Sequence, residues 1–145
     1  MKTLTFEITI HAPRSQVWTA MLGAEGYKAW TAAFCEGSHY VGSWEQGARI
    51  RFLAPSGGGM SAVIAENRLH EFVSIRHLGI IENGVEDTSS EKVRAWTPAY
   101  ENYRFADVPG GCLVTVTLDT AAEWEPYMLD TYPKALALLK ALCER

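Results

Sequence analysis

The sequence predicts an α+β fold, in which helices cover one face of a single antiparallel sheet. Short segments of alternating apolar and polar residues, bounded by glycine, proline or asparagine, are typical of antiparallel strands. Helical patterns are confined to two short stretches after the first strand and one long stretch late in the chain. The 145 residues fit a single domain, 1–145, which is long enough to bury a full hydrophobic core.

The first strand is expected at Lys2–Ile10, where apolar residues alternate with polar ones. Pro13 then indicates the start of a helix, because proline at the first helical position loses no hydrogen bond that the helix needs. Gly23 is expected to end this helix, and a second short helix follows over Ala24–Trp30.

Strands are predicted for most of the middle of the chain. A glycine-punctuated region before Arg49 predicts one strand, and further alternating segments are Arg49–Ala54, Met60–Glu66, Glu71–Ile81, Glu101–Asp107 and Cys112–Thr120. The glycines before Met60 predict a hairpin turn and not a phosphate loop, because a strand follows them. Strand parity then predicts a buried face made of Val73, Ile75, His77, Ile81, Tyr103, Phe105, Val114, Val116 and Leu118.

The segment Glu82–Pro98 is polar and acidic, and it is too long for a tight hairpin. Within it, Thr88–Glu91 has the spacing of a capping box, which predicts a short helix that ends near Trp96. A connection of this length in a compact domain is often functional.

The last helix is expected from about Ala122 to Glu144, because Thr120–Glu123 is a second capping box. Pro126 and Pro133 interrupt the backbone hydrogen bonding, so we expect a bend or a late start. The apolar stripe of this helix consists of Trp124, Met128, Tyr132, Leu136, Leu139 and Leu142.

Charge and composition exclude several classes of function. The net charge of −4 and the scattered basic residues argue against nucleic acid as a partner. No apolar run approaches the length of a membrane span, and Met1 leads directly into a strand pattern rather than an export signal. The three cysteines are odd in number, which fits reduced thiols in the cytoplasm. Neither the cysteines nor the histidines have metal-site spacing, so no metal or cofactor is predicted.

The chain resembles the START-like (SRPBCC) superfamily, and within it the branch related to the C-terminal domain of the activator of Hsp90 ATPase. The resemblance rests on the order of segments along the whole chain, namely Ile10–Pro13 with Val17 and Trp18, Trp30, Gly42–Gly47, Tyr103–Phe105, Gly110–Val116 and Tyr132–Lys140. It implies the helix-grip fold, a curved antiparallel sheet of about six to seven strands around a long C-terminal helix, with a hydrophobic cavity between them. It offers no shared catalytic motif, and no catalytic residue is assigned.

The candidate ligand-binding residues are the large side chains that this fold would bring together. Those expected around the cavity are Phe52, Ile75, Tyr103, Phe105, Met128, Tyr132 and Leu136, and those expected near its mouth are Trp30, Phe34, Trp96 and Tyr100. The alternative for each aromatic is that it fills space in a densely packed core. The cavity is expected to take an apolar or aromatic small molecule, because tyrosine, tryptophan and methionine suit such sites.

Polar groups are also expected in the cavity. By strand parity His77, Glu101 and Tyr103 face inward from neighbouring strands, where they could orient a ligand or exchange a proton. The alternative is that His77 is a satisfied core histidine and Glu101 a carboxylate at the rim.

The segment Glu82–Pro98 is expected to gate the cavity, with Trp96 and Tyr100 over the mouth. Its acidic residues, Glu82, Glu86, Asp87 and Glu91, would stay in water. An interface with a second subunit and a mobile loop are the alternatives, and monomer and homodimer both stay open.

Binding of a hydrophobic small molecule, such as a lipid or a polyketide-like compound, is therefore ranked first among the functions. A cyclase-like or hydrolase-like enzyme that uses the polar residues of the cavity is second. A chaperone-linked or protein-interaction role, which the resemblance implies, is third.

Overall fold

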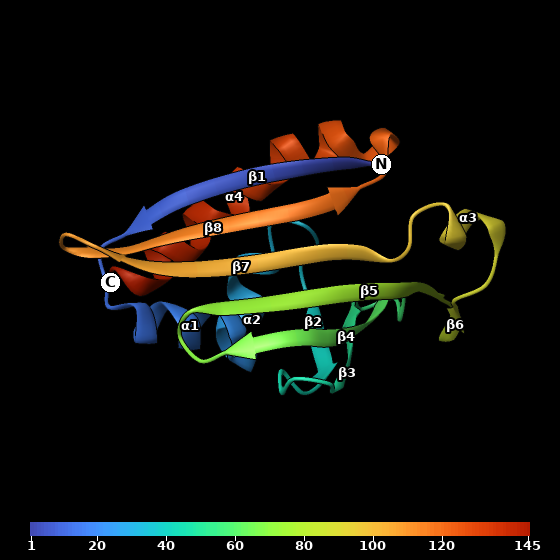
Figure 1. Ribbon diagram of the computed structural model, residues 1–145, viewed down its shortest axis with the longest axis horizontal. Coiled ribbons are helices and arrows are strands. Elements are labelled where there is room, and N and C mark those ends of the chain that lie inside the picture. The colour runs from blue at the N-terminus through green and yellow to red at the C-terminus, as the bar shows by residue number, and fades with distance from the viewer.

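The computed structural model describes residues 1–145 and has the predicted α+β class. A single antiparallel sheet lies across the molecule, and the three longer helices lie together behind it (Figure 1). The strands are β1 (Lys2–Ile10), β2 (His39–Gly42), β3 (Arg49–Leu53), β4 (Gly59–Arg68), β5 (Phe72–Glu82), β6 (Val85–Asp87), β7 (Ala99–Val108) and β8 (Gly111–Thr120). The helices are α1 (Arg14–Leu22), α2 (Ala24–Thr31), α3 (Glu91–Arg94) and α4 (Glu125–Cys143).

The sheet is one strand larger than the resemblance implied. Seven strands follow the order β1-β8-β7-β5-β4-β3-β2, and the three-residue β6 pairs with β5 outside this path. The additional strand is β6, which the sequence pattern did not predict because it lies in the polar segment after β5.

The first strand, β1, pairs with the last one, β8, so residues far apart in the sequence are neighbours at one edge of the sheet. The register runs from Lys2 opposite Thr120 to Ile10 opposite Cys112. Helix α4 packs against the same strand, where the Lys140 ammonium donates to the Thr9 carbonyl at 3.0 Å.

Helices α1 and α2 meet at a tight corner that depends on glycine. A Cβ atom at Gly26 would lie 1.8 Å from the carbonyl oxygen of Ala20, so only glycine lets the two helices come this close. The Trp30 indole donates to the Met21 carbonyl at 2.9 Å across the same corner. The corner thereby directs Tyr27 and Trp30, both buried, toward the sheet.

Both capping-box predictions were wrong in detail. Ser90, and not Thr88, caps α3, because its hydroxyl accepts from the Val93 amide. Thr120 is still paired in β8, and a 3-10 turn at Ala122–Trp124 precedes α4. The late start expected from the prolines is confirmed, with Pro126 in the first turn of α4 and Pro133 inside the helix.

The segment after β5 is more ordered than its polarity suggested. Asn83 and Gly84 both have positive φ, at 53° and 77°, which is the geometry of a tight two-residue hairpin. This hairpin pairs β5 with β6, and α3 then leads to β7. Glu86 and Asp87 are half-buried, whereas the prediction left them in water. Glu86 pairs with Arg49 at 3.4 Å, and Asp87 accepts from the amides of Ser89 and Ser90.

The core lies between the sheet and the helices. Its buried cluster includes the inward residues predicted for β7 and β8, namely Tyr103, Phe105, Val114, Val116 and Leu118. On α4, Tyr132, Leu136 and Leu139 are buried as predicted, whereas Trp124 is 54% exposed because it lies in the 3-10 turn before the helix. No helix is long and apolar enough to cross a bilayer.

Candidate functional site

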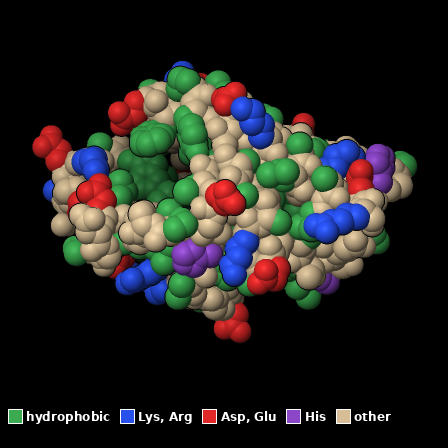
Figure 2. Space-filling view, turned by 180° about the vertical axis from the view of Figure 1, so that it is seen from behind, with side chains coloured by type: hydrophobic (Ala, Val, Ile, Leu, Met, Phe, Trp, Pro, Cys, Tyr) green, Lys and Arg blue, Asp and Glu red, His purple; other side chains and the backbone are tan.

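A cavity of about 460 Å³ lies between the inner face of the sheet, helices α2 and α4, and the connection from α3 to β7. Fifteen of its 23 lining residues are hydrophobic. In the view from behind the sheet, a deep recess with hydrophobic walls opens on the surface (Figure 2).

Most of the residues predicted for the ligand site line this cavity. They are Trp30, Phe34, Phe52, His77, Trp96, Glu101, Tyr103, Met128 and Tyr132. These side chains come from α2 and the turn after it, from β3, β5, β7 and α4, and from the loop before β7, so the fold brings them together from most of the chain.

Four predicted residues do not line the cavity. Ile75, Phe105 and Leu136 are buried in the core, where Phe105 packs on Trp18 at a ring distance of 5.1 Å. Tyr100 lies on the outer face of β7, because it is one residue from Glu101 and side chains alternate along a strand. The prediction that Tyr100 covers the mouth was therefore wrong.

Sequence reasoning missed several residues of the cavity wall. Tyr27 lies three residues before Trp30 on α2, so the helical period could have placed both on one face. Leu118 was predicted to face inward but was not connected with the cavity. Trp124 was predicted on the apolar stripe of the last helix but was not connected with the cavity. Met60 and Tyr127 were not singled out, since their positions depend on how β4 and the start of α4 pack.

A polar cluster of His77, Glu101, Tyr103 and Tyr132 lies in this apolar cavity. His77 Nε2 is 3.0 Å from Glu101 Oε1. The Tyr103 hydroxyl donates to Glu101 Oε2 at 2.9 Å, and the Tyr132 hydroxyl donates to the same oxygen. One carboxylate therefore connects two strands of the sheet with helix α4.

The strand register explains why His77 and Glu101 meet. His77 lies opposite Ala99, and Ile75 lies opposite Glu101, so His77 and Glu101 are diagonal neighbours on one face of β5 and β7. Diagonal neighbours in a sheet are within reach of long side chains. Tyr103 follows Glu101 by two residues and faces the same side.

The cluster favours an ionised carboxylate at neutral pH. Burial raises the pKa of Glu101, but the hydrogen bond and charge of His77 and the two tyrosine hydroxyls lower it by more, so the pKa lies below its ordinary value. Burial, followed by the charge of Glu101, raises the pKa of Tyr103 and Tyr132 well above the ordinary value. Both phenols therefore stay protonated and act as donors.

His77 has one ring nitrogen without a partner. The residue is 1% exposed, and Nδ1 makes no hydrogen bond although it is buried. The ring is held between aromatic neighbours, stacked with Trp96 at 5.7 Å and edge-on to Phe52 at 5.8 Å. The alternative that His77 is a satisfied core histidine therefore does not hold for Nδ1, which has no partner. A buried polar atom without a hydrogen bond is costly.

The mouth of the cavity carries exposed aromatic rings. Trp124 and Tyr127, which are 54% and 40% exposed, pack edge to face at 6.1 Å near the start of α4. Cys35, also exposed, lies on the same lining, whereas the other two cysteines are buried.

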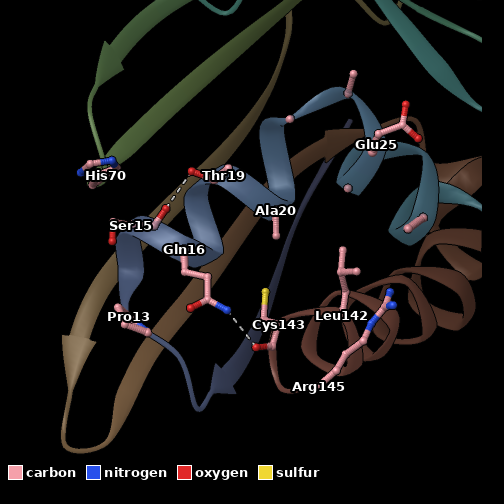
Figure 3. Close-up of a pocket in the computed structure, with 14 residues that line it drawn as sticks. Pro13, Ser15, Gln16, Thr19, Ala20, Glu25, His70, Leu142, Cys143 and Arg145 are labelled. Carbon is pink, nitrogen blue, oxygen red and sulfur yellow. Dashed lines mark hydrogen bonds between the residues drawn. The ribbon is translucent and has the colours of Figure 1, made fainter.

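A second hollow lies at the other end of the helices, between α1, the start of α2 and the end of α4 (Figure 3). It is wide, at about 850 Å³, but open to solvent, and only five of its 14 lining residues are hydrophobic. Two of its polar side chains already bond to the backbone, Gln16 to the Cys143 carbonyl at 3.1 Å and Thr19 to the Ser15 carbonyl at 3.0 Å. No group of three or more His, Cys, Asp or Glu side chains could hold a metal ion here or elsewhere in the structure. The 460 Å³ cavity is therefore the candidate site.

Comparison with solved structures identifies the fold of this chain. The sequence matches no protein-family model and no curated protein. Among solved structures, protein MLL2253 from Mesorhizobium loti has a TM-score of 0.74 at 12% identity, covering 97% of this chain and 96% of that one. The Aha1 dimer from Colwellia psychrerythraea has a TM-score of 0.73 at 17% identity, covering 99% and 97%.

DynU16, a protein of the dynemicin biosynthetic locus, is similar over 97% of this chain and 46% of its own length, with a TM-score of 0.73 and 12% identity. At such identities the likeness shows the fold. The sheet, the two short helices after β1 and the long last helix thus give this chain the helix-grip fold of Aha1 and the SRPBCC proteins.

Proposed function

We propose that this protein binds an apolar or aromatic small molecule in the cavity between the sheet and helices α2 and α4. The observation that carries the proposal is the cavity itself. Natural cores rarely leave voids larger than a water molecule, whereas 460 Å³ lies in the range of small-molecule sites. Its wall is mostly apolar with a few convergent polar groups, which is the usual composition of such sites.

The comparisons support a ligand of this kind without naming it. SRPBCC proteins commonly bind hydrophobic ligands, and DynU16 belongs to a biosynthetic locus for a natural product. A polyketide-like or other aromatic compound would match the ring-rich wall, which includes Tyr27, Trp30, Phe34, Phe52 and Trp96.

The direct test is binding of N-phenyl-1-naphthylamine, an uncharged probe that fluoresces in apolar sites. Ala54 directly follows β3 and lines the cavity, so Ala54→Trp should fill the cavity and abolish binding. Arg51→Trp places the same side chain on the exposed outer face of that strand and should leave binding unchanged. If the native protein does not bind the probe, or Ala54→Trp binds it as well as the native protein does, the cavity is not the site.

Cys35 offers an independent measurement because it is the exposed thiol on the cavity lining. Burial raises the pKa of Cys112 and Cys143, so a thiol reagent should modify Cys35 first. Occupancy of the cavity by the probe should slow this reaction. An unchanged rate at saturating probe would place the probe elsewhere.

A second candidate, proton transfer to a bound molecule, is favoured by the pair of His77 and Glu101. A carboxylate that holds one nitrogen of a buried imidazole leaves the other nitrogen to act as a base. Turnover of a bound compound by the native protein, lost in His77→Gln, would establish an enzyme. Binding without turnover would leave a carrier or sensor.

A further inference from the structure

The polar cluster presents hydrogen-bond acceptors to the cavity. Glu101 receives the hydroxyl protons of Tyr103 and Tyr132 and the contact from His77 Nε2. The protons of both phenols are thus used within the cluster, and their oxygen lone pairs remain. His77 also lines this part of the cavity, and its Nδ1 is the buried nitrogen of the cluster that has no partner.

Apart from His77 when its ring is protonated, the charged groups that line the cavity are negative. Glu101 and Asp119 are the acidic residues on its lining, and no lysine or arginine is among the lining residues. Asp119 is already held by the Thr3 hydroxyl at 2.7 Å and by the Tyr100 amide at 3.1 Å. A ligand carboxylate placed against the cluster would be buried beside Glu101, and its one cationic partner would be a protonated His77 that Glu101 already holds, which is unfavourable.

Nδ1 of His77 is the atom of the polar cluster that lacks a hydrogen-bond partner. If the imidazole is neutral and donates through Nε2, then Nδ1 is an unpartnered acceptor. If the ring is protonated, Nδ1 carries an unpartnered N–H. An aromatic hydroxyl serves both states, because a phenol donates to the neutral ring and its oxygen accepts from the protonated one. An ammonium group serves only the first state, and a carboxylate is repelled by Glu101.

Resting on the proposed function, we infer that the ligand is an uncharged, flat aromatic compound whose ring hydroxyl bonds to Nδ1 of His77. Glu101 acts as the positioning residue, since it fixes Nε2 and thereby leaves Nδ1 for the ligand. Trp96 stacks on the imidazole at 5.7 Å, and Phe52 lies edge-on to it at 5.8 Å, so aromatic rings flank the place of the hydroxyl.

The test uses three probes with the same ring system, naphthalene, 2-naphthol and 2-naphthoate, titrated into the native protein by calorimetry. We expect 2-naphthol to bind about 3- to 10-fold more tightly than naphthalene, which is the effect of one hydrogen bond. We expect 2-naphthoate to bind at least about tenfold more weakly than 2-naphthol, because its carboxylate is desolvated beside the negative charge of Glu101.

Two further measurements assign the hydroxyl to His77. His77→Gln keeps an amide donor for Glu101 but has no ring nitrogen, so its preference for 2-naphthol over naphthalene should disappear while naphthalene still binds. Emission of bound 2-naphthol gives a spectroscopic signature, since excited naphthol transfers its proton to a base in direct contact. The native complex should emit as naphtholate, and the variant complex should emit as naphthol.

The outcomes separate this inference from the proposed function. If none of the probes binds the native protein, the proposed function fails with it. If naphthalene and 2-naphthol bind the native protein equally, or 2-naphthoate binds best, the cavity is a ligand site but the inference is overturned. A folded His77→Gln protein that keeps the preference and the naphtholate emission would also overturn it.

Discussion

Glu101 is the residue on which the polar cluster depends. Its pKa is lowered in the folded protein, so its ionised form stabilises the fold above the ordinary carboxyl pKa, and that contribution is lost as the pH falls through the lowered value. Glu101→Gln should therefore reduce the free energy of unfolding by about 1–3 kcal/mol at neutral pH. The difference should shrink in acid.

Urea unfolding of both proteins over a pH series checks this. Glu82→Gln is the matched control, because Glu82 is an exposed carboxylate paired with Lys92 at 2.8 Å, and such pairs contribute little. A difference between native protein and Glu101→Gln that grows in acid would contradict the lowered pKa.

The two phenols should each contribute a charge-assisted hydrogen bond. Replacing Tyr103 or Tyr132 with Phe keeps the ring and should lower the free energy of unfolding by about 1.5–3 kcal/mol. Because both hydroxyls bond to Oε2 of Glu101, the double variant should depart from the sum of the single ones. Tyr100→Phe, on the outer face, should change little, and equal losses at all three positions would show that the bonds to Glu101 are not responsible.

Among single residues, the sequence predicted three members of the polar cluster but did not predict the hydrogen bond from Tyr132 to Glu101. Strand parity predicted all three to face inward, because Glu101 and Tyr103 are two residues apart on one strand and His77 follows Ile75 by two residues on another. Tyr132 was predicted to face inward, but its bond to Glu101 depends on how α4 lies across the sheet. The separation of Nδ1 from any partner likewise depends on tertiary packing.

Among the elements, the corner between α1 and α2 gives a sharp prediction about packing. Gly26→Ala would place a methyl group against the Ala20 carbonyl, so it should lower the free energy of unfolding by about 1–3 kcal/mol or more. It should also weaken probe binding, because α2 carries Tyr27 and Trp30. At Gly58 an added Cβ would make only ordinary contacts, the nearest at 3.4 Å, so Gly58→Ala is the control for stability. Thermal unfolding of both variants and probe titration of Gly26→Ala check the prediction, and equal losses of stability would refute the role of the corner.

The connection from β6 to β7 is predicted to gate the cavity through Trp96. Trp96→Ala removes the ring that stacks on His77 and should speed release of N-phenyl-1-naphthylamine by about three- to tenfold in stopped flow, without unfolding the domain. Tyr100→Ala is the control, since Tyr100 faces the other side of the sheet. Unchanged release with a marked loss of stability would show that Trp96 is ordinary core.

The elements were easier to predict than their ends. Alternation and helical spacing located β1, β5, β7, β8 and α4, because the core selects for those patterns over many residues. The start of a helix depends on one or two capping side chains, and neighbouring polar residues can serve as the cap instead. Asp87 accepts from the amides of Ser89 and Ser90, which favours Ser90 over Thr88 as the cap.

For the whole molecule, the position of the cavity between two layers predicts how a ligand affects stability. A probe at 100 times its dissociation constant should add about 2.7 kcal/mol to the free energy of unfolding. For a domain of this size that corresponds to a rise in Tm of roughly 5–10 °C. Differential scanning fluorimetry with N-phenyl-1-naphthylamine measures it. Ala54→Trp should show no rise, and an equal rise in that variant would mean that the probe binds elsewhere.

The architecture as a whole was predictable because the order of strands and helices admits few compact arrangements. The volume of the cavity was not, since a void depends on small differences in side-chain packing that no local pattern records. Ile75, Phe105 and Leu136 illustrate this, because they lie among the inward residues yet fill space in the core.

The pairing of β1 with β8 also determines when the protein can fold during synthesis. The first strand leaves the ribosome early, but its partner follows it by about a hundred residues, and α4 comes later still. Until then the nascent chain exposes the apolar face of β1, including Leu4 and Phe6. Chaperones or other nascent chains can bind this face. The cavity is completed only when α4 has emerged, so a ligand of the proposed kind would stabilise the finished fold and not the growing chain.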